Sequence, residues 1–184
     1  GTESVRTAGL KVGPPRRGSP ESPTLYRIEV RYGNDTLSDQ FGFRRFESRQ
    51  GQLFLNGEPI YLTGALDYDF HPEGIYTPPA YPQLIALMRQ ARQLGFNLLR
   101  THAKVPAPEY LRAADETGMM IWYEVPGGMT SWWSSSASQR TELTFLGQLR
   151  RDWNHPSVII QSILNESQGL GNISDRSSHQ WLKA

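Results

Sequence analysis

The chain has no cysteine, which excludes a disulfide-stabilised scaffold and a zinc site with thiolate ligands. It also lacks an excess of charge of either sign, because 19 basic and 18 acidic residues leave a formal net charge of +1. A nucleic-acid-binding domain usually shows a basic excess, so the composition disfavours that class of partner. Long apolar runs are missing too: none approaches the ~20 residues that a membrane-spanning helix needs. The hydrophobic share of 38% is nevertheless enough for the packed core of a folded domain.

The start of the chain has little that belongs to a natural N-terminus. Residues 1–18 are polar and contain neither an initiator methionine nor the apolar core of a signal peptide. We therefore expect these 184 residues to be an internal piece of a longer protein. The sequence leaves its cellular compartment and its oligomeric state open.

The first quarter of the chain is predicted to be irregular and then β-structured. Proline and glycine are concentrated in residues 14–23, which indicates an irregular segment. Apolar and polar residues alternate imperfectly in Thr24–Tyr32, as in a strand, and Gly33–Asp35 is a turn signal. A second strand is predicted at Gln40–Glu47. Two strands without a helix make an incomplete sheet, since an isolated hairpin is only marginally stable in water.

Beyond Pro59 the pattern changes to alternating apolar strands and amphipathic helices. Proline near the start and glycine after the end mark the first two helices. Near-continuous apolar strands separated by helices predict a parallel sheet with both faces covered. No Gly-rich phosphate loop follows the first of them, which favours half of a (β/α)8 barrel over a doubly wound open sheet. The predicted strands are 60–66, 97–102, 119–123 and 158–164, and the predicted helices are 82–94, 108–117, 143–153 and 174–183.

Polar and ionisable residues follow each of these strands. In a (β/α)8 barrel the chemistry lies at the carboxyl ends of the strands, so these side chains are candidates for a site. Loops are polar in any α/β protein, and part of the pattern would occur without a function. In chain order the candidates are Asp67, Asp69, Arg100, His102, Lys104, Glu124, Asn165 and Glu166.

Glu166 is the residue best placed for acid–base chemistry. It follows an apolar strand, and partial burial at the barrel mouth would raise its pKa, as a general acid requires. Arg100 and His102 share one face of their strand, and the Arg100 guanidinium could hold a carboxylate ionised or simply pair with Glu124. Retaining glycoside hydrolysis needs two carboxyl groups ~5–5.5 Å apart. Glu166 could be one of them, while Glu124 could be a sugar-binding or supporting group.

Tryptophan residues near these strands have competing interpretations. Trp132 and Trp133 lie in a glycine- and serine-rich loop, where they could form a stacking platform for sugar rings or simply cover the barrel mouth. Trp153 fits the apolar stripe of the helix through Leu143 and is predicted to belong to the core.

A set of motifs, in this order, resembles glycoside hydrolase family 2, the group of β-galactosidases, β-glucuronidases and β-mannosidases. The most specific is Asn-His-Pro-Ser-Val-Ile-Ile at 154–160 followed by Asn-Glu-Ser at 165–167, which resembles the fourth barrel strand with its acid/base. The resemblance extends from about Ser22 to Gly171. The other motifs are similar to the crossing from sandwich to barrel, the first strand with its hairpin, the second strand, the end of the second helix and the third strand: Phe41–Glu47, Leu55–Gly64, Gly95–His102, Ala114–Gly118 and Trp122–Glu124.

The resemblance implies a domain organisation and an activity. Residues 48–184 are expected to be the first half, strands 1–4, of a (β/α)8 catalytic barrel. Residues 1–47 are expected to be the last strands of an immunoglobulin-like β-sandwich. The implied activity is that of a retaining β-glycosidase, which binds a terminal sugar of a carbohydrate and uses no cofactor.

The resemblance also implies roles for individual residues. Glu166 would be the general acid/base, Asn165 would hydrogen-bond the sugar 2-hydroxyl, and Arg100 would support the nucleophile. The nucleophile of the family is a Glu on the seventh strand, which we expect beyond Ala184. Further substrate-binding candidates are His102, Glu124 and Asp67, and no cluster has a recognisable metal-ligand spacing.

Two segments depart from the family pattern. Ala65–Asp69 stands where many members carry an Asn-Arg-His-Glu segment, and Ala103–Pro106 replaces the common Tyr-Pro after His102. Both segments line the sugar pocket in relatives, so the resemblance does not specify the sugar. Two other functions remain alternatives: a carbohydrate-binding barrel without catalysis, and a purely structural α/β domain.

Overall fold

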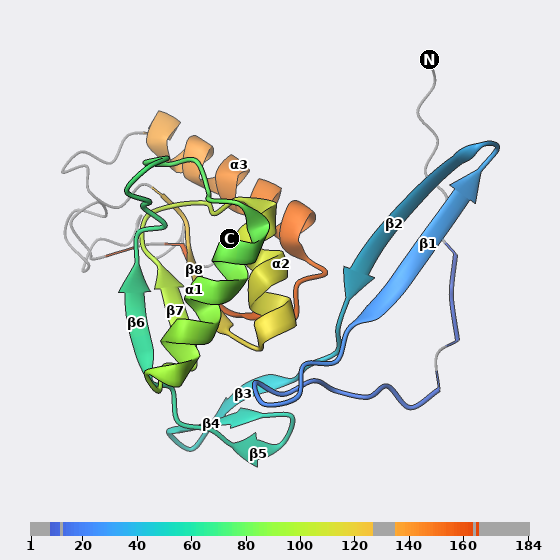
Figure 1. Ribbon diagram of the computed structural model, residues 1–184, viewed down its shortest axis with the longest axis horizontal. Helices are drawn as coiled ribbons and strands as arrows, with labels where there is room; N and C mark the ends of the chain where they lie inside the picture. The colour runs from blue at the N-terminus through green and yellow to red at the C-terminus, as the bar shows by residue number, and fades with distance from the viewer. Residues whose placement is uncertain (1–7, 12, 127–134, 164, 166–184) are drawn as a thin grey trace.

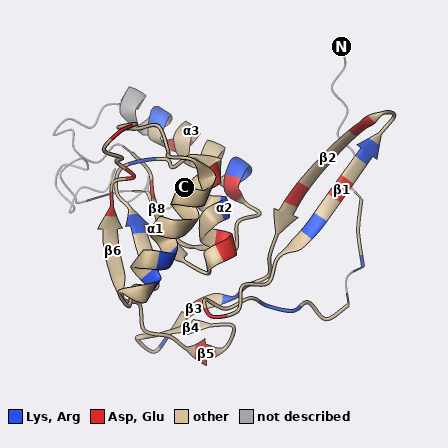
Figure 2. Ribbon diagram, viewed as in Figure 1, with Lys and Arg blue, Asp and Glu red and all other residues tan. Residues whose placement is uncertain are grey.

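The computed structural model describes residues 8–11, 13–126, 135–163 and 165. Its elements form a β-hairpin, a small antiparallel sheet and a parallel sheet with helices (Figure 1). Acidic and basic residues are interspersed on the hairpin and on the helices (Figure 2), consistent with the near-zero net charge. Within the described part of the chain, no helix is long and apolar enough to span a membrane.

The hairpin consists of β1 (Tyr26–Tyr32) and β2 (Asp35–Phe41), and it extends away from the helices (Figure 1). The second strand was predicted at 40–47, and that prediction is wrong. Because the loop has only two residues, with Gly33 at φ 60°, Tyr32 pairs at once with Asp35 and the ladder ends at Phe41. Whether residues 1–47 belong to an immunoglobulin-like sandwich stays a prediction.

A small antiparallel sheet closes the amino end of the barrel strands. It contains β3 (Phe46–Arg49), β4 (Gln52–Leu55) and β5 (Glu58–Pro59). Leu55 from this sheet packs with Leu98 and Met120, whose side chains belong to the barrel strands. These three buried residues form an inner core on the face of the parallel sheet that the helices do not cover.

The parallel sheet has the strand order expected of a barrel cut in half. It contains β6 (Gly64–Asp67), β7 (Leu98–Thr101), β8 (Met120–Glu124) and β9 (Val158–Ser162), in sequence order. β6 begins later than predicted, because the N–H of Ile60 donates to the Leu53 carbonyl and so extends the small sheet instead. All three strand pairs are parallel, which confirms the α/β barrel prediction in this region.

Helices α1 (Tyr81–Gln93), α2 (Pro108–Thr117) and α3 (Ser135–Asp152) accompany the sheet (Figure 1). The first two begin and end as their sequences predict. Pro108 opens α2 because the first helical N–H needs no partner, and Gly118 ends it in the left-handed conformation at φ 72°. An outer core joins α1 and α2 to the sheet and consists of Leu84, Met88, Leu99, Tyr110, Leu111, Ala113, Ala114, Met119, Ile121, Tyr123 and Val158.

The buried side of α3 is polar, which the apolar stripe did not predict. Thr141, Gln148 and Asp152 are buried, and Asp152 accepts a 2.6 Å hydrogen bond from the Tyr123 hydroxyl. Burial, reinforced by this bond, raises the pKa of Tyr123, so the hydroxyl stays protonated as a donor. The prediction that Trp153 is core is wrong: it is 76% exposed, because α3 ends at Asp152 and the helical period stops there.

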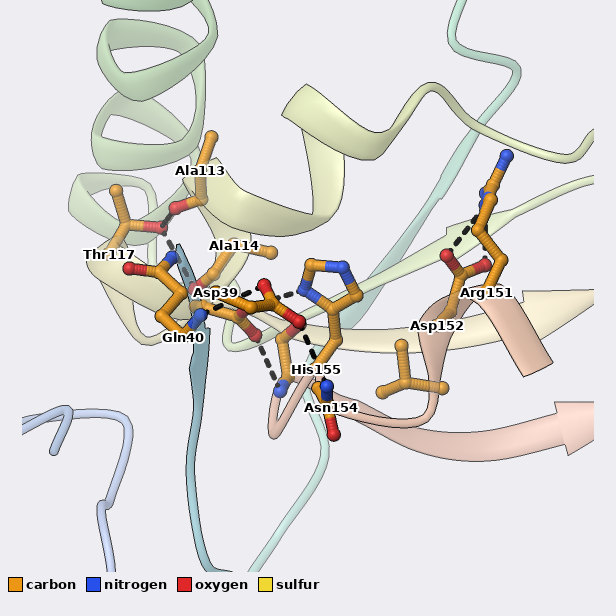
Figure 3. Close-up of polar contacts among 12 residues, drawn as sticks. Asp39, Gln40, Ala113, Ala114, Thr117, Arg151, Asp152, Asn154 and His155 are labelled. Carbon is orange, nitrogen blue, oxygen red and sulfur yellow. Dashed lines mark hydrogen bonds and ion pairs between the residues drawn. The ribbon is translucent and has the colours of Figure 1, made fainter. Parts of the chain in front are cut away.

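A polar junction joins the end of the hairpin to the turn before β9. Figure 3 shows Asn154 and His155 beside Asp39. The Asn154 amide donates to Asp39 Oδ2 at 2.9 Å, and this hydrogen bond lowers the pKa of the Asp39 carboxyl. His155 Nδ1 lies 2.6 Å from Oδ2 of buried Asp115. The junction therefore fixes the base of the fourth barrel strand against the second helix and the hairpin.

Candidate active site

Three of the predicted site residues meet at the carboxyl end of the parallel sheet. Arg100 from β7 donates to Glu124 Oε2 through Nε at 3.0 Å and through Nη2 at 2.7 Å. Nη2 also donates to Asn165 Oδ1, just beyond β9, at 2.7 Å. Alternate residues of a strand point to one face, so Arg100 and Glu124 project together from neighbouring strands. The guanidinium thus joins side chains from three consecutive strand ends.

His102 completes this cluster, which we call the Arg100 cluster: Arg100, His102, Glu124 and Asn165. Its Nδ1 lies 3.3 Å from Glu124 Oε2, the same oxygen that Arg100 holds. The prediction that Arg100 and His102 share a face is confirmed by this common partner. The carboxylate of Glu124 is fully buried, and an ion removed from water is stable only with such partners.

One of the two carboxylate oxygens of Glu124 makes no hydrogen bond to the described residues. Oε1 is buried without a hydrogen-bond partner among the residues that the structure describes. A buried acceptor left unsatisfied costs free energy, so such an atom is suited to receive a hydroxyl or N–H from a ligand. Glu166, the predicted acid/base, lies outside the described residues, as do Trp132 and Trp133. Asn165, a member of the Arg100 cluster, directly precedes Glu166 in the sequence.

Asp67 is not brought into the Arg100 cluster. Its register partner on β7 is Thr101 rather than Arg100. Its carboxylate accepts a 2.6 Å hydrogen bond from the Tyr110 hydroxyl of α2 and a 2.7 Å bond from the N–H of Asp69. Burial and the Asp67 charge raise the pKa of Tyr110 well above its usual value, which keeps that hydroxyl a donor. These contacts give Asp67 a part in ordering the loop after β6.

The rim of the site is held by a second charged group around Asp69. This buried carboxylate lies 2.6 Å from the Lys104 ammonium and 2.8 Å from His71 Nε2. Lys104 also donates to the Asp69 carbonyl at 2.8 Å. Because Asp69 follows β6 and Lys104 follows β7, the pair ties together the two loops that depart from the family pattern. Nothing in either loop predicts the pairing, since it depends on the approach of two irregular segments.

Two residues that sequence reasoning missed adjoin the Arg100 cluster: Trp122 is in register with Arg100, and Ser162 is in register with Glu124. The Arg100 guanidinium lies over the Trp122 ring, with 4.9 Å between Cζ and the ring centroid. The Trp122 indole N–H donates to Ser162 Oγ at 2.7 Å. Strand alternation could have placed Trp122 on the face of Glu124, because it is two residues before Glu124. Ser162 could not be found in this way, because its place opposite Glu124 depends on the register between β8 and β9.

The chemistry of the Arg100 cluster suits polyol binding beside a charged centre. It offers guanidinium and amide donors together with a buried carboxylate oxygen that lacks a partner among the described residues. In the part of the chain that the structure describes, no group of three or more His, Cys, Asp or Glu residues could hold a metal ion.

Comparisons with known proteins agree with this architecture. A "Beta-galactosidase" of Photobacterium profundum is 33% identical over 189 residues, which cover 95% of this chain and 18% of that protein. The apo structure of Bacteroides uniformis beta-glucuronidase 3 superposes with a TM-score of 0.75 at 28% identity, covering 91% of this chain and 22% of that one. The Parabacteroides merdae beta-glucuronidase gives a TM-score of 0.78 at 26% identity, covering 96% and 24%.

The chain thus spans about a fifth of the length of such relatives. Residues 46–183 match the family described as "Glycosyl hydrolases family 2, TIM barrel domain". This match covers most of the chain and includes the four parallel strands and the Arg100 cluster. The protein belongs to glycosyl hydrolase family 2, and this chain contains barrel strands of its TIM barrel domain.

Proposed function

We propose that the intact protein hydrolyses terminal β-glycosidic bonds with retention of configuration, and that Glu166 is its acid/base. The observation that carries the proposal is the position of Arg100, which holds both Glu124 and Asn165 at the residue before Glu166. Membership in a family of glycosidases supports the reaction class. The role of Glu166 rests on its place in the sequence after the fourth strand.

The proposed reaction has two steps. Glu166 first donates its proton to the glycosidic oxygen while a second carboxylate attacks the anomeric carbon, so that the C–O bond breaks and a glycosyl ester forms. Glu166, now ionised, then removes a proton from water, which attacks the same carbon and releases the second carboxylate. We propose that the second carboxylate comes from a part of the protein outside these 184 residues.

The Arg100 cluster would bind the sugar beside the bond that breaks. Asn165 Oδ1 accepts from Arg100, and its NH₂ group, for which no acceptor is found among the described residues, would donate to a sugar hydroxyl. Glu124 Oε1, which has no partner among the described residues, would accept from another hydroxyl. His102, at 12% side-chain exposure, would line the same wall. Asp67 would act at a distance, by ordering the loop through Tyr110.

The substrate class is a carbohydrate with a terminal β-linked sugar. Similar proteins are named beta-galactosidases and beta-glucuronidases, so these two glycones are the first to test, and β-mannoside is the third. The experiment measures release of an aryl leaving group from the three β-glycosides by the whole protein, with Glu166→Gln as its matched variant.

We expect one glycoside to be cleaved, and Glu166→Gln to lose most of that activity, since general acid–base catalysis contributes about 10²- to 10⁴-fold. Equal activity of both proteins would contradict the role of Glu166. Tight binding of a sugar with no hydrolysis by either protein would instead favour the alternative, a carbohydrate-binding barrel without catalysis.

A further inference from the structure

Trp122 lies at the middle of β8, two residues before Glu124 and therefore on the same face of the strand. It pairs in register with Arg100 on β7 and with Ile160 on β9. Paired residues of neighbouring strands project to the same face, so its ring lies under the Arg100 guanidinium, with 4.9 Å from Cζ to the ring centroid. Its indole N–H donates to Ser162 Oγ at 2.7 Å, which fixes the orientation of the ring.

The guanidinium above it is held in a defined plane. All donors of a guanidinium lie in its plane, and its faces attract the electron-rich face of an aromatic ring. In the plane, Nε and Nη2 bond Glu124 and Asn165. Among the described residues, none accepts a hydrogen bond from Nη1 of Arg100. Within the described part of the chain, one nitrogen with two N–H groups therefore has no acceptor.

We propose that Trp122 is a positioning residue for catalysis: its indole, oriented by Ser162, sets the plane of Arg100 so that Nη1 points at an oxygen of the reacting groups. The proposal rests on the proposed function, because it assigns Arg100 to the glycosidase site. The Arg100 guanidinium, which would stabilise negative charge in the reaction, is thus held from three directions: by Glu124, by Asn165 and by the indole face.

Packing alone makes a different prediction. Trp122 is partly buried against Leu98 and Met120 of the inner core, so it also fills volume. A residue that only fills volume would not depend on its N–H or on its π face. The contributions of the N–H and of the π face can be separated. Trp122→Phe keeps an aromatic face and loses the N–H, whereas Trp122→Leu loses both. Ser162→Ala removes the acceptor and leaves the ring.

The experiment uses the whole protein and measures kcat, KM and the pH dependence of kcat/KM. Trp122→Leu is expected to lower kcat about 3- to 30-fold, the range of a partly desolvated cation–π contact, with KM changed less than about twofold. The acidic limb of the pH profile is expected to move to higher pH, because a misplaced guanidinium stabilises an ionised carboxylate less. Trp153→Leu, at a side chain 76% exposed, is the matched control and should leave all three unchanged.

Non-additivity tests the hydrogen bond itself. Trp122→Phe and Ser162→Ala remove the same N–H···O contact, so the double variant should have a kcat no lower than Trp122→Phe alone. A packing role predicts that Ser162→Ala has the parent kcat. That result, or a parent kcat and pH profile in Trp122→Leu, would overturn the proposal.

A crystal structure of Trp122→Leu provides a readout that needs no turnover. Arg100 should leave its bonds to Glu124 and Asn165 or take more than one conformation. An unmoved Arg100 overturns the proposal, whatever the kinetics. If Glu166→Gln keeps the parent activity, the proposed function fails, while the position of Arg100 still decides the role of Trp122.

Discussion

Replacing Arg100 by methionine removes the main counter-ion of a fully buried carboxylate. Glu124 has 0% side-chain exposure, and Arg100, at 26%, contributes two of its hydrogen bonds. Of the residues that the structure describes, His102, with Nδ1 at 3.3 Å, is the partner that remains. Methionine fills a similar volume without charge, so the change tests the ion pair more than the packing.

The expected cost follows from the burial of the carboxylate. Removing one partner of a buried ion pair destabilises a protein by about 3–5 kcal/mol, because the other charge is left uncompensated. A destabilisation of this size corresponds to roughly 150- to 4,000-fold faster exchange of those amide hydrogens that exchange only when the sheet unfolds. The effect should concentrate in β7 and β8, whose amides lie under the pair.

Hydrogen exchange of the whole protein, followed by mass spectrometry of peptides from β7 and β8, measures this change. Arg31→Met is the matched control, since its ion pair with Glu29 joins side chains that are 75% and 36% exposed. Surface pairs of this kind contribute about 0–1 kcal/mol, so its exchange should stay near that of the parent.

The double variant Arg100→Met/Glu124→Gln tests whether the unpaired charge of Glu124 causes the loss of protection. The neutral amide that replaces the Glu124 carboxylate costs about 1–3 kcal/mol of stability, because some of its hydrogen bonds are not made. This cost is smaller than that of an unpaired buried charge. The second substitution should therefore restore part of the protection that the first removes. Exchange in the double variant as fast as in Arg100→Met, or faster, would refute the reasoning.

Three further predictions concern the packing and the hairpin junction, and each is measured by hydrogen exchange or denaturant unfolding of the whole protein. Leu111→Ala, at a side chain with 0% exposure, should cost about 2–5 kcal/mol, whereas Leu143→Ala, at 69% exposure, should cost little; equal effects would contradict the outer core. Gly118→Ala combines a left-handed φ of 72° with overlap of a backbone carbonyl oxygen and should cost about 2–4 kcal/mol, against about 1 kcal/mol for Gly51→Ala, at φ 76° with open space around it. The lowered pKa of Asp39 means that its stabilisation is present above the unfolded pKa, near 3.8, and is lost as pH falls through the folded pKa. The protection of the hairpin should thus fall as pH drops below about 3.8, and it should fall less in Asp39→Asn than in the parent; parallel pH curves would contradict the junction.

Local signals in the sequence predicted the elements that depend on local physics. Proline at 108 and glycine at 118 mark the ends of α2, where the structure has them. The common parity of Arg100 and His102 predicted their shared face, because strand alternation needs no knowledge of the partner strand. The second strand of the hairpin was misplaced, since its position depends on how tightly the turn closes.

Features that depend on the approach of distant segments could not be predicted. The Asp69–Lys104 pair requires two loops to meet, and neither loop has a periodic pattern. The polar buried face of α3 follows from the partner that it meets, Tyr123, rather than from the apolar stripe of the helix itself. The position of Trp122 under Arg100 depends on the register between β7 and β8, which is a tertiary property.

The most direct test of the central proposal is the chemistry of Glu166→Ala in the whole protein, with an activated aryl β-glycoside of the preferred sugar. The good leaving group needs no proton, so the glycosyl-enzyme should still form, while its hydrolysis should be slow without a general base. Added azide needs no base either, and it should restore turnover and yield a β-glycosyl azide. Turnover equal to that of the parent, or a slow variant on which azide has no effect, would contradict the assignment of Glu166 as the acid/base.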